Sequence, residues 1–109
     1  MRKSSRLILA LDETDKSKAL AIAGSVAGLV DAIKINWPLV LSAGPEIITE
    51  LSKFSDVICD FKVADIPNTV HLIVEGSVNR GAAAVQMKDT ALPDAVQRIR
   101  TAIDEYMDE

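Results

Sequence analysis

The sequence contains one cysteine and one histidine among its 109 residues, and only 4% of its residues are aromatic. A single cysteine, Cys59, excludes an intramolecular disulfide and is typical of a protein that works in a reducing compartment. One cysteine and one histidine are also too few to build a thiolate or imidazole metal site. We therefore expect no structural metal and no disulfide framework, so the fold must depend on an apolar core.

Long apolar runs and an excess of positive charge are missing as well. No apolar segment approaches the roughly 18 residues of a membrane span. The short apolar run near the start is followed at once by acidic residues, which a secretory signal would not have. The formal net charge of −4 argues against a nucleic-acid partner, because proteins that bind the phosphate backbone usually have a basic face. We expect a cytoplasmic protein without a membrane or nucleic-acid partner.

A repeated pattern of a short apolar run followed by helical periodicity organises the chain. The runs start about 25 residues apart, which is the length of one strand–helix unit; they are Leu7–Leu11, Ala32–Ile35, Val57–Phe61 and Ala82–Val85. Apolar residues recur at helical spacing after each run; they lie within 19–30, 47–51, 73–78 and 95–106. Pro93 suits the first turn of the last helix. This alternation predicts an α/β fold, a single domain over residues 1–109 with four βα units and a parallel sheet.

Two closures of such a sheet fit the periodicity. A doubly wound sheet with helices on both faces could be complete near this length. A (β/α)₈ barrel needs about 250 residues, so four units would be half of one. The polar residues favour the half-barrel. The strands alternate so that one side is aliphatic, while the other side ends in Asp12, Lys34, Asp60 and Lys62. Barrel enzymes hold their catalytic groups at this end of the strands.

Two carboxylates and two ammonium groups in one pocket would give each charge an opposite neighbour, which keeps all four ionised despite partial burial. A lysine between carboxylates keeps its proton and can deliver it to a carbanion. Such a site fits decarboxylation without a cofactor, or proton transfer at carbon. The alternative is that these four side chains are only solvated strand ends. The single Cys59 lies on the aliphatic side and is interpreted as a core residue, and Trp37 is interpreted as a packing anchor for the turn after the second strand.

The segment DFKVADIPNT (residues 60–69) resembles the D-x-K-x-x-D-I-P motif of orotidine 5′-monophosphate decarboxylases. LILALD (7–12) is similar to the first strand of that family, and DAIKINWPLVLSAGPEII (31–48) to its second strand and helix. The likeness runs from about residue 6 to residue 85 and is strongest to archaeal members. The motif core also occurs in hexulose-phosphate synthases and keto-gulonate-phosphate decarboxylases, but the Ile-Pro-Asn-Thr continuation favours the orotidine branch.

This resemblance implies a role for each charged residue. Asp12 would hydrogen-bond the ribose hydroxyls of an orotidine monophosphate-like nucleotide, and Lys34 would contact the ribose and the charged residues. Asp60 would lie against the substrate carboxylate. Lys62 would be the general acid that protonates C6 after carbon dioxide leaves. No cofactor is implied.

The resemblance also implies a partner. Asp65 would reach across a dimer interface into the site of the second copy, accompanied by Ile66 and Thr69. Family members bind phosphate and pyrimidine with loops of later strands, which this sequence does not contain. Residues 86–109 diverge from the family and read as an amphipathic helix. A half-barrel leaves two edge strands and its interior face open, which favours a homo-oligomer.

Three functions therefore remain open from the sequence. The first is an orotidine 5′-monophosphate decarboxylase in a shortened form with impaired activity. The second is a phosphosugar decarboxylase or hexulose-phosphate synthase on the same fold. The third is a half-barrel scaffold that assembles but does not catalyse.

Overall fold

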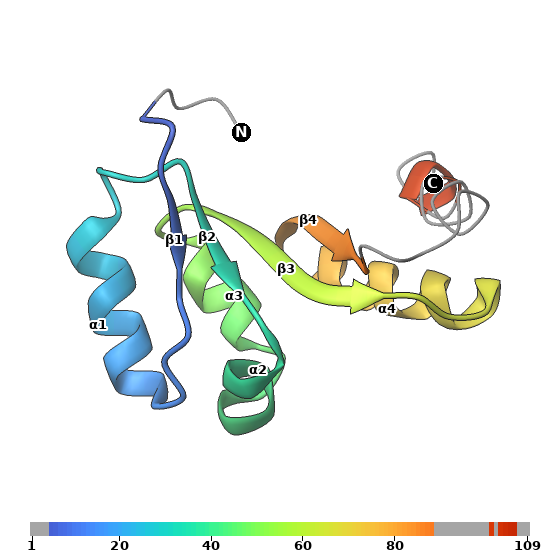
Figure 1. Ribbon diagram of the computed structural model, residues 1–109, viewed down its shortest axis with the longest axis horizontal. Coiled ribbons are helices and arrows are strands. Elements are labelled where there is room, and N and C mark those ends of the chain that lie inside the picture. The colour runs from blue at the N-terminus through green and yellow to red at the C-terminus, as the bar shows by residue number, and fades with distance from the viewer. Residues whose placement is uncertain (1–4, 89–100, 102, 107–109) are drawn as a thin grey trace.

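Four parallel strands form one sheet, and their order in the sheet is their order in the sequence (Figure 1). The computed structural model describes residues 5–88, 101 and 103–106. Within these residues the strands are β1 (Ile8–Ala10), β2 (Ala32–Ile35), β3 (Asp56–Val63) and β4 (Ala82–Met87). Each strand is joined to the next through at least one helix, so the predicted α/β fold of consecutive βα units is confirmed.

The helices begin where the local sequence supplies caps. They are α1 (Lys16–Val26), α2 (Trp37–Ala43), α3 (Ile47–Ser52) and α4 (Pro67–Asn79). The Asp15 carboxylate accepts a hydrogen bond from the amide of Lys18 at 2.9 Å and caps α1. Asn36 caps α2 by accepting from the amide of Trp37 at 2.7 Å. These side chains satisfy backbone donors that would otherwise be left without a partner at the helix ends.

The segment between β2 and β3 differs from its predicted periodicity. The apolar stripe predicted a helix around residues 47–51, and α3 lies there, but a second helix, α2, precedes it. Gly44 separates the two because its φ of 85° ends α2 in a conformation that favours glycine. Two short helices separated by a turn at Gly44 therefore follow β2, in place of one long helix.

The core lies between the sheet and the helices, on one face of the sheet. Side chains on this face are almost fully buried and pack against α1, α3 and α4; they include Leu11, Ile33, Ile35, Val57, Cys59, Phe61 and Val63. The opposite face is open, and Ile8, Ala10 and Ala84 are exposed on it. Ala32 is the one buried residue of the described strands on this face. One covered face and one open face match a half-barrel and exclude the doubly wound alternative, in which helices would cover both faces.

The pairing of β3 with β4 is irregular at its far end. In the register Cys59 stands opposite Val85, and the next pair is Val63 with Met87. Four steps along β3 therefore match two steps along β4, so β3 carries two extra residues in a bulge. Lys62 lies in this bulge and has a φ of 50°. Bulges of this kind redirect side chains and are common beside active sites.

The remaining described residues near the C-terminus are helical at Thr101 and from Ile103 to Tyr106. The Tyr106 hydroxyl donates to the side-chain oxygen of Asn79, and Ile103 packs against the core, so this piece contacts α4. Most of the predicted helix over residues 95–106 lies outside the described residues. Among the helices that the structure describes, none has the length and apolarity required to cross a membrane.

Candidate active site

Four of the predicted site residues lie on the open face of the sheet, at the carboxyl ends of its strands: Asp12, Lys34, Asp60 and Lys62. Ala10 pairs with Lys34, and Lys34 pairs with Ile58, so these three residues are level across β1, β2 and β3. Asp12 and Asp60 lie two residues further along their own segments. Parallel strands place their carboxyl ends at one edge of the sheet, so the predicted residues gather at that edge.

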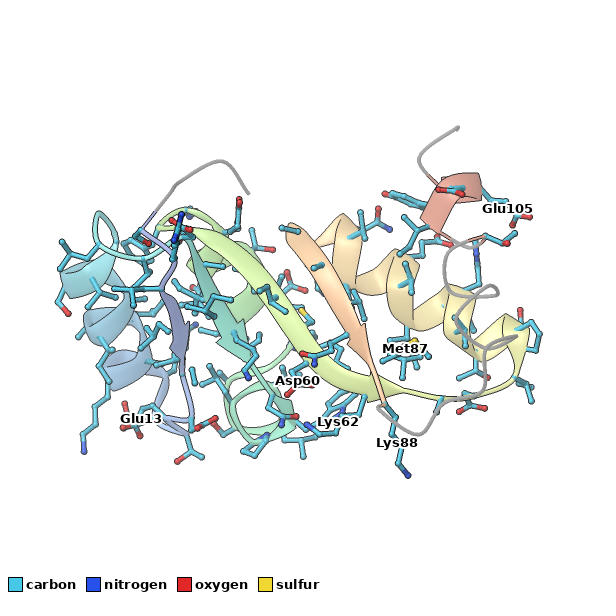
Figure 2. All side chains as sticks on the ribbon, turned by 45° about the horizontal axis from the view of Figure 1, so that its top comes forward. Glu13, Asp60, Lys62, Met87, Lys88 and Glu105 are labelled. Atoms are coloured by element: carbon cyan, nitrogen blue, oxygen red, sulfur yellow. The ribbon has the colours of Figure 1, made fainter. Side chains whose placement is uncertain are left out.

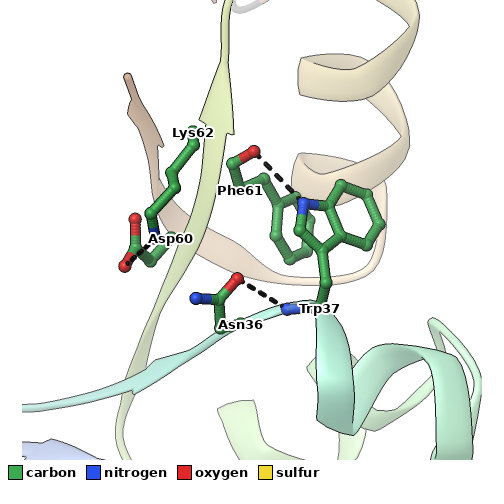
Figure 3. Close-up of polar contacts among 5 residues, drawn as sticks. All are labelled: Asn36, Trp37, Asp60, Phe61 and Lys62. Carbon is green, nitrogen blue, oxygen red and sulfur yellow. Dashed lines mark hydrogen bonds and ion pairs between the residues drawn. The ribbon is translucent and has the colours of Figure 1, made fainter. Parts of the chain in front are cut away.

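Asp60 and Lys62 form the one contact among the four predicted charges. The Lys62 ammonium nitrogen is 3.0 Å from Oδ2 of Asp60, and Figure 3 shows this ion pair beside the end of β3. The Asp60 side chain is 14% exposed and that of Lys62 is 54% exposed. Both groups lie on the open face, near the centre of the molecule in Figure 2. The pair therefore combines a largely covered carboxylate with an ammonium that reaches solvent.

Asp12 and Lys34 do not complete the expected network of alternating charges. Within the described residues, no hydrogen bond or ion pair joins either side chain to a neighbour. Asp12 is exposed, and Lys34 is partly covered between β1 and β3. Of the network of four charges predicted from strand parity, only the ion pair between Asp60 and Lys62 is formed.

The backbone of Lys62 is held in the left-handed region. For a residue with a Cβ atom a φ of 50° is costly, by about 1–2 kcal/mol. Such conformations persist only where the surroundings impose them, and they cluster at functional sites. At Lys62 the unusual backbone lies in the bulge of β3, between the buried side chains of Phe61 and Val63. The direction of the Lys62 side chain is therefore imposed by its surroundings.

Trp37 contacts the segment between these two charges. Its indole N–H donates to the main-chain carbonyl of Phe61 at 3.2 Å (Figure 3). The two rings are stacked, with centroids 4.3 Å apart and an interplanar angle of 22°. Packing by Trp37 was expected from the sequence, but its hydrogen bond to the strand was not. The pairing of β2 with β3 explains the contact. Ile35 pairs with Cys59, so Trp37 and Phe61, each two residues further along, come level with each other.

Asp65 lies beyond β3 in the loop before α4, as predicted. Its carboxylate accepts a hydrogen bond from the amide of Ile66 at 2.7 Å, and both residues are exposed. Ile66 precedes the first residue of α4, and Thr69 lies in the first turn of that helix. Within the described part of the chain, no hydrogen bond or ion pair joins these three residues to Asp60 or Lys62. Asp65 and Ile66 are thus exposed beyond the end of β3, and Thr69 is partly buried at the start of α4.

Two further features lie on the helix-covered side of β3. Burial raises the pKa of the Cys59 thiol from 9.0 to about 12, so this thiol is a core group and not a nucleophile. A cavity of about 170 Å³ lies between α2, α3 and α4, and Trp37, Val40, Phe61 and Ile73 are among the residues that line it. No cluster of three or more potential ligand side chains for a metal ion occurs in the described part of the chain.

Comparison with known proteins identifies the family. The model of the orotidine 5′-phosphate decarboxylase / HUMPS family matches residues 5–108. The chain belongs to this family. The resemblance based on the DFKVADIPNT motif is thereby confirmed. The edge of the sheet where the carboxyl ends of the strands meet corresponds to the end of a (β/α)₈ barrel at which active sites lie.

Individual relatives agree with this assignment. The orotidine 5′-phosphate decarboxylase of Methanococcoides burtonii is 55% identical over 85 residues, which are 78% of this chain and 40% of that protein. A crystal structure of orotidine 5′-monophosphate decarboxylase from Methanocaldococcus jannaschii superposes with a TM-score of 0.83 at 40% identity, over 91% of this chain and 49% of that one. The M. jannaschii structure complexed with inhibitor BMP superposes with a TM-score of 0.82, also at 40% identity, over 91% of this chain and 47% of that one. The chain thus spans less than half the length of the relatives it matches.

Proposed function

We propose that this chain carries the catalytic strand ends of an orotidine 5′-monophosphate decarboxylase, which converts orotidine monophosphate to uridine monophosphate without a cofactor. The observation that supports this most directly is the ion pair between Asp60 and Lys62 on the open face of β3. Membership of the family suggests the reaction. The carboxylate of Asp60 and the ammonium of Lys62 are the two groups that this reaction needs.

The proposed chemistry begins with the substrate carboxylate beside Asp60. Two negative groups at close range raise the energy of the bound ground state, and this repulsion is relieved when carbon dioxide leaves. The bond from C6 to the carboxylate carbon breaks, and its electron pair remains on C6. Lys62 then transfers one ammonium proton to C6 and becomes a neutral amine. Because the Lys62 side chain is 54% exposed, solvent can return the proton before the next turnover.

Asp12 and Lys34 are proposed to hold the ribose hydroxyls of the nucleotide. Their side chains lie on the same face as Asp60 and have no partner of their own among the described residues. A carboxylate accepts from hydroxyl groups and an ammonium donates to them, so the two residues can orient the sugar from one side. The substrate would then lie across β1, β2 and β3, with its base toward Lys62.

We further propose that the protein works as a homo-oligomer, with Asp65, Ile66 and Thr69 reaching the site of a second copy. The exposed position of Asp65 and Ile66 beyond β3 supports this role. The open face of the sheet and the unpaired outer edges of β1 and β4 in the described sheet also favour association. A single buried cysteine fits a reducing cytoplasm as the place where it acts.

Residues 1–109 alone are expected to have impaired activity. Binding of the remote phosphate supplies part of the energy that such enzymes convert into stabilisation of the transition state. The chain spans less than half the length of these relatives, so contacts from later strands are not supplied by residues 1–109.

The proposal is tested by assaying the chain on orotidine monophosphate, and by measuring its affinity for that nucleotide calorimetrically. Turnover that is lost in Lys62→Ala and retained in Lys53→Ala would support the proposal, because Lys53 is an exposed lysine at the end of α3. Turnover of a keto-sugar phosphate instead would favour the phosphosugar branch. If the chain shows no turnover and binds no nucleotide, the proposal is contradicted and the non-catalytic scaffold remains.

A further inference from the structure

The segment that joins Asp60 to Lys62 is held less by the sheet than the rest of β3. The register with β2 ends at Cys59, and the register with β4 passes from Cys59 to Val63. In the sheet as described, Asp60, Phe61 and Lys62 therefore have no opposite residue in either neighbouring strand. Ladder pairing alone does not determine how the peptide between Phe61 and Lys62 is turned.

Trp37 supplies a contact that can determine this orientation. Its indole N–H is bonded to the carbonyl oxygen of Phe61, and this oxygen belongs to the same peptide unit as the amide nitrogen of Lys62. The peptide is planar, so fixing its carbonyl also fixes the direction of the Lys62 N–H. That direction sets the φ of Lys62, which is 50°. The stacked ring of Phe61 adds a second contact from the same tryptophan.

We propose that Trp37 is a positioning residue for Lys62: its indole N–H holds the Phe61–Lys62 peptide in the orientation that places the Lys62 ammonium 3.0 Å from Asp60. The inference about catalysis rests on the proposed function, in which Lys62 is the proton donor. The inference about geometry does not, because it concerns the bulge and its backbone alone.

The surroundings of Trp37 explain why the hydrogen bond matters beyond packing. Trp37 follows directly on Asn36, which caps α2, so its main chain is anchored at the start of a helix. Trp37 is 40% exposed as a residue and borders the cavity of about 170 Å³, so the core does not enclose it. Close packing therefore does not fix the ring on the side that borders the cavity. The indole N–H therefore gives the ring a defined orientation against β3.

The test compares two variants that each lose one hydrogen bond from a side chain to the main chain. Trp37→Phe keeps an aromatic ring for the stack and removes the N–H donor. Thr49→Val keeps the shape of its side chain and removes the hydroxyl that donates to the carbonyl of Arg80 at 2.7 Å, at the edge of the sheet where β4 begins. Both variants should lose similar stability, but only the first removes a contact to the bulge.

The decisive readout is the backbone of Lys62, followed by NMR in the full 109-residue chain. Left-handed residues have characteristic Cα and Cβ chemical shifts. We expect Trp37→Phe to move the Lys62 and Phe61 resonances toward those of extended backbone, and Thr49→Val to leave them unchanged. Unaltered Lys62 shifts in Trp37→Phe would overturn the inference.

A second measurement keeps the inference falsifiable if Trp37→Phe does not fold. Trp37 is the single tryptophan, so the unmodified chain gives one indole N–H signal. Slow exchange of this proton with solvent supports the hydrogen bond to Phe61, and exchange at the rate of free indole overturns it.

Activity separates this inference from the proposed function. If the chain decarboxylates orotidine monophosphate, Trp37→Phe should lower kcat by roughly 10- to 100-fold at similar KM, since misplacing a catalytic group by a fraction of an ångström affects the chemical step. Thr49→Val should leave kcat unchanged. If the unmodified chain has no activity, the proposed function fails, while the NMR comparison still decides whether Trp37 positions Lys62.

Discussion

The carboxylate of Asp60 and the ammonium of Lys62 form an ion pair whose two members are unequally exposed, at 14% and 54% of their side chains. Loss of Lys62 leaves a largely covered carboxylate without its donor, whereas loss of Asp60 leaves an ammonium that water can still solvate. The two residues are therefore unequal for stability, although both are assigned to the same chemistry.

Removing either member of this pair should show the inequality. We expect Lys62→Met to lower the free energy of unfolding by about 1 kcal/mol, because a covered acceptor loses its partner. Asp60→Asn should cost less than about 0.5 kcal/mol, because the exposed ammonium of Lys62 is still solvated by water. Urea denaturation of the two variants measures both values. Equal losses, or a larger loss in Asp60→Asn, would contradict this account.

The left-handed backbone of Lys62 predicts a gain in stability from glycine. Lys62→Gly and Lys62→Ala lose the same ammonium, but only glycine adopts a φ of 50° without steric cost. We expect the glycine variant to be more stable than the alanine variant by about 1 kcal/mol, with both inactive. Thermal and urea unfolding of the two proteins measure the difference. If alanine proved as stable as glycine, Lys62 would not be strained in solution.

Cys59 predicts a loss of stability in alkali. Its pKa is raised by burial from 9.0 to about 12, so the unfolded chain releases this proton at a lower pH than the native protein. The contribution of Cys59 is fully present below pH 9 and is lost as the pH rises toward 12, with a slope of at most about 1.4 kcal/mol per pH unit.

Comparison with Cys59→Ala separates the contribution of Cys59 to the free energy of unfolding from those of the other groups that titrate in alkali. The difference in free energy of unfolding between the unmodified chain and the variant should be constant below pH 9 and should shrink above it. A thiol reagent should also react with Cys59 only after unfolding. A constant difference up to pH 10.5 would show that the thiol is not buried in solution.

Two glycines predict opposite effects of the same substitution. Gly81 has a φ of 109°, and a Cβ atom added there would lie 3.0 Å from the hydroxyl of Ser52. Gly81→Ala should therefore cost about 2 kcal/mol or more. Gly28 has no atom within 4 Å of the added Cβ, and Gly28→Ala should be neutral or stabilising by up to about 1 kcal/mol. Denaturation midpoints of the two variants would test this, and similar midpoints would refute it.

The open face of the sheet predicts self-association through aliphatic side chains. Ile8 on β1 is 52% exposed, and Leu72 on α4 is 59% exposed on the opposite layer. We expect Ile8→Lys to weaken association strongly and Leu72→Lys to leave it nearly unchanged, because only the first lies on the face that the helices do not cover. Sedimentation at several concentrations measures both. Equal effects, or a monomer before any substitution, would contradict association through this face.

Strand positions and the sidedness of the sheet follow from period-two patterns in the sequence. The predicted strand Ala32–Ile35 is β2 itself, and the alternation around Cys59 placed its side chain in the core. For the same reason Asp60 and Lys62 were expected on one side together. Such predictions succeed because a buried strand repeats one local rule along its length.

The features that escaped sequence reasoning depend on contacts between segments. The φ of Lys62 arises from a bulge between β3 and β4, and the hydrogen bond of Trp37 joins residues 24 positions apart. The division of the helical segment at Gly44 depends on how α2 and α3 both reach the core. The expected contacts of Asp12 and Lys34 did not form, because strand parity fixes the face of a side chain but not the direction of its flexible end.

The order of the strands has a consequence for how the chain folds. Each strand after β1 pairs with the strand that precedes it in the sequence. Partners such as Ile8 with Ala32 and Ala32 with Asp56 are 24 residues apart, and those between β3 and β4 are 24 to 26 residues apart. Every ladder thus closes a loop of similar, modest length, and no strand needs a distant segment of the chain as its partner. Folding can advance one βα unit at a time from the N-terminus during synthesis. The outer edge of β4 then serves as the growing end of the sheet, to which a further strand could be added without disturbing those already in place.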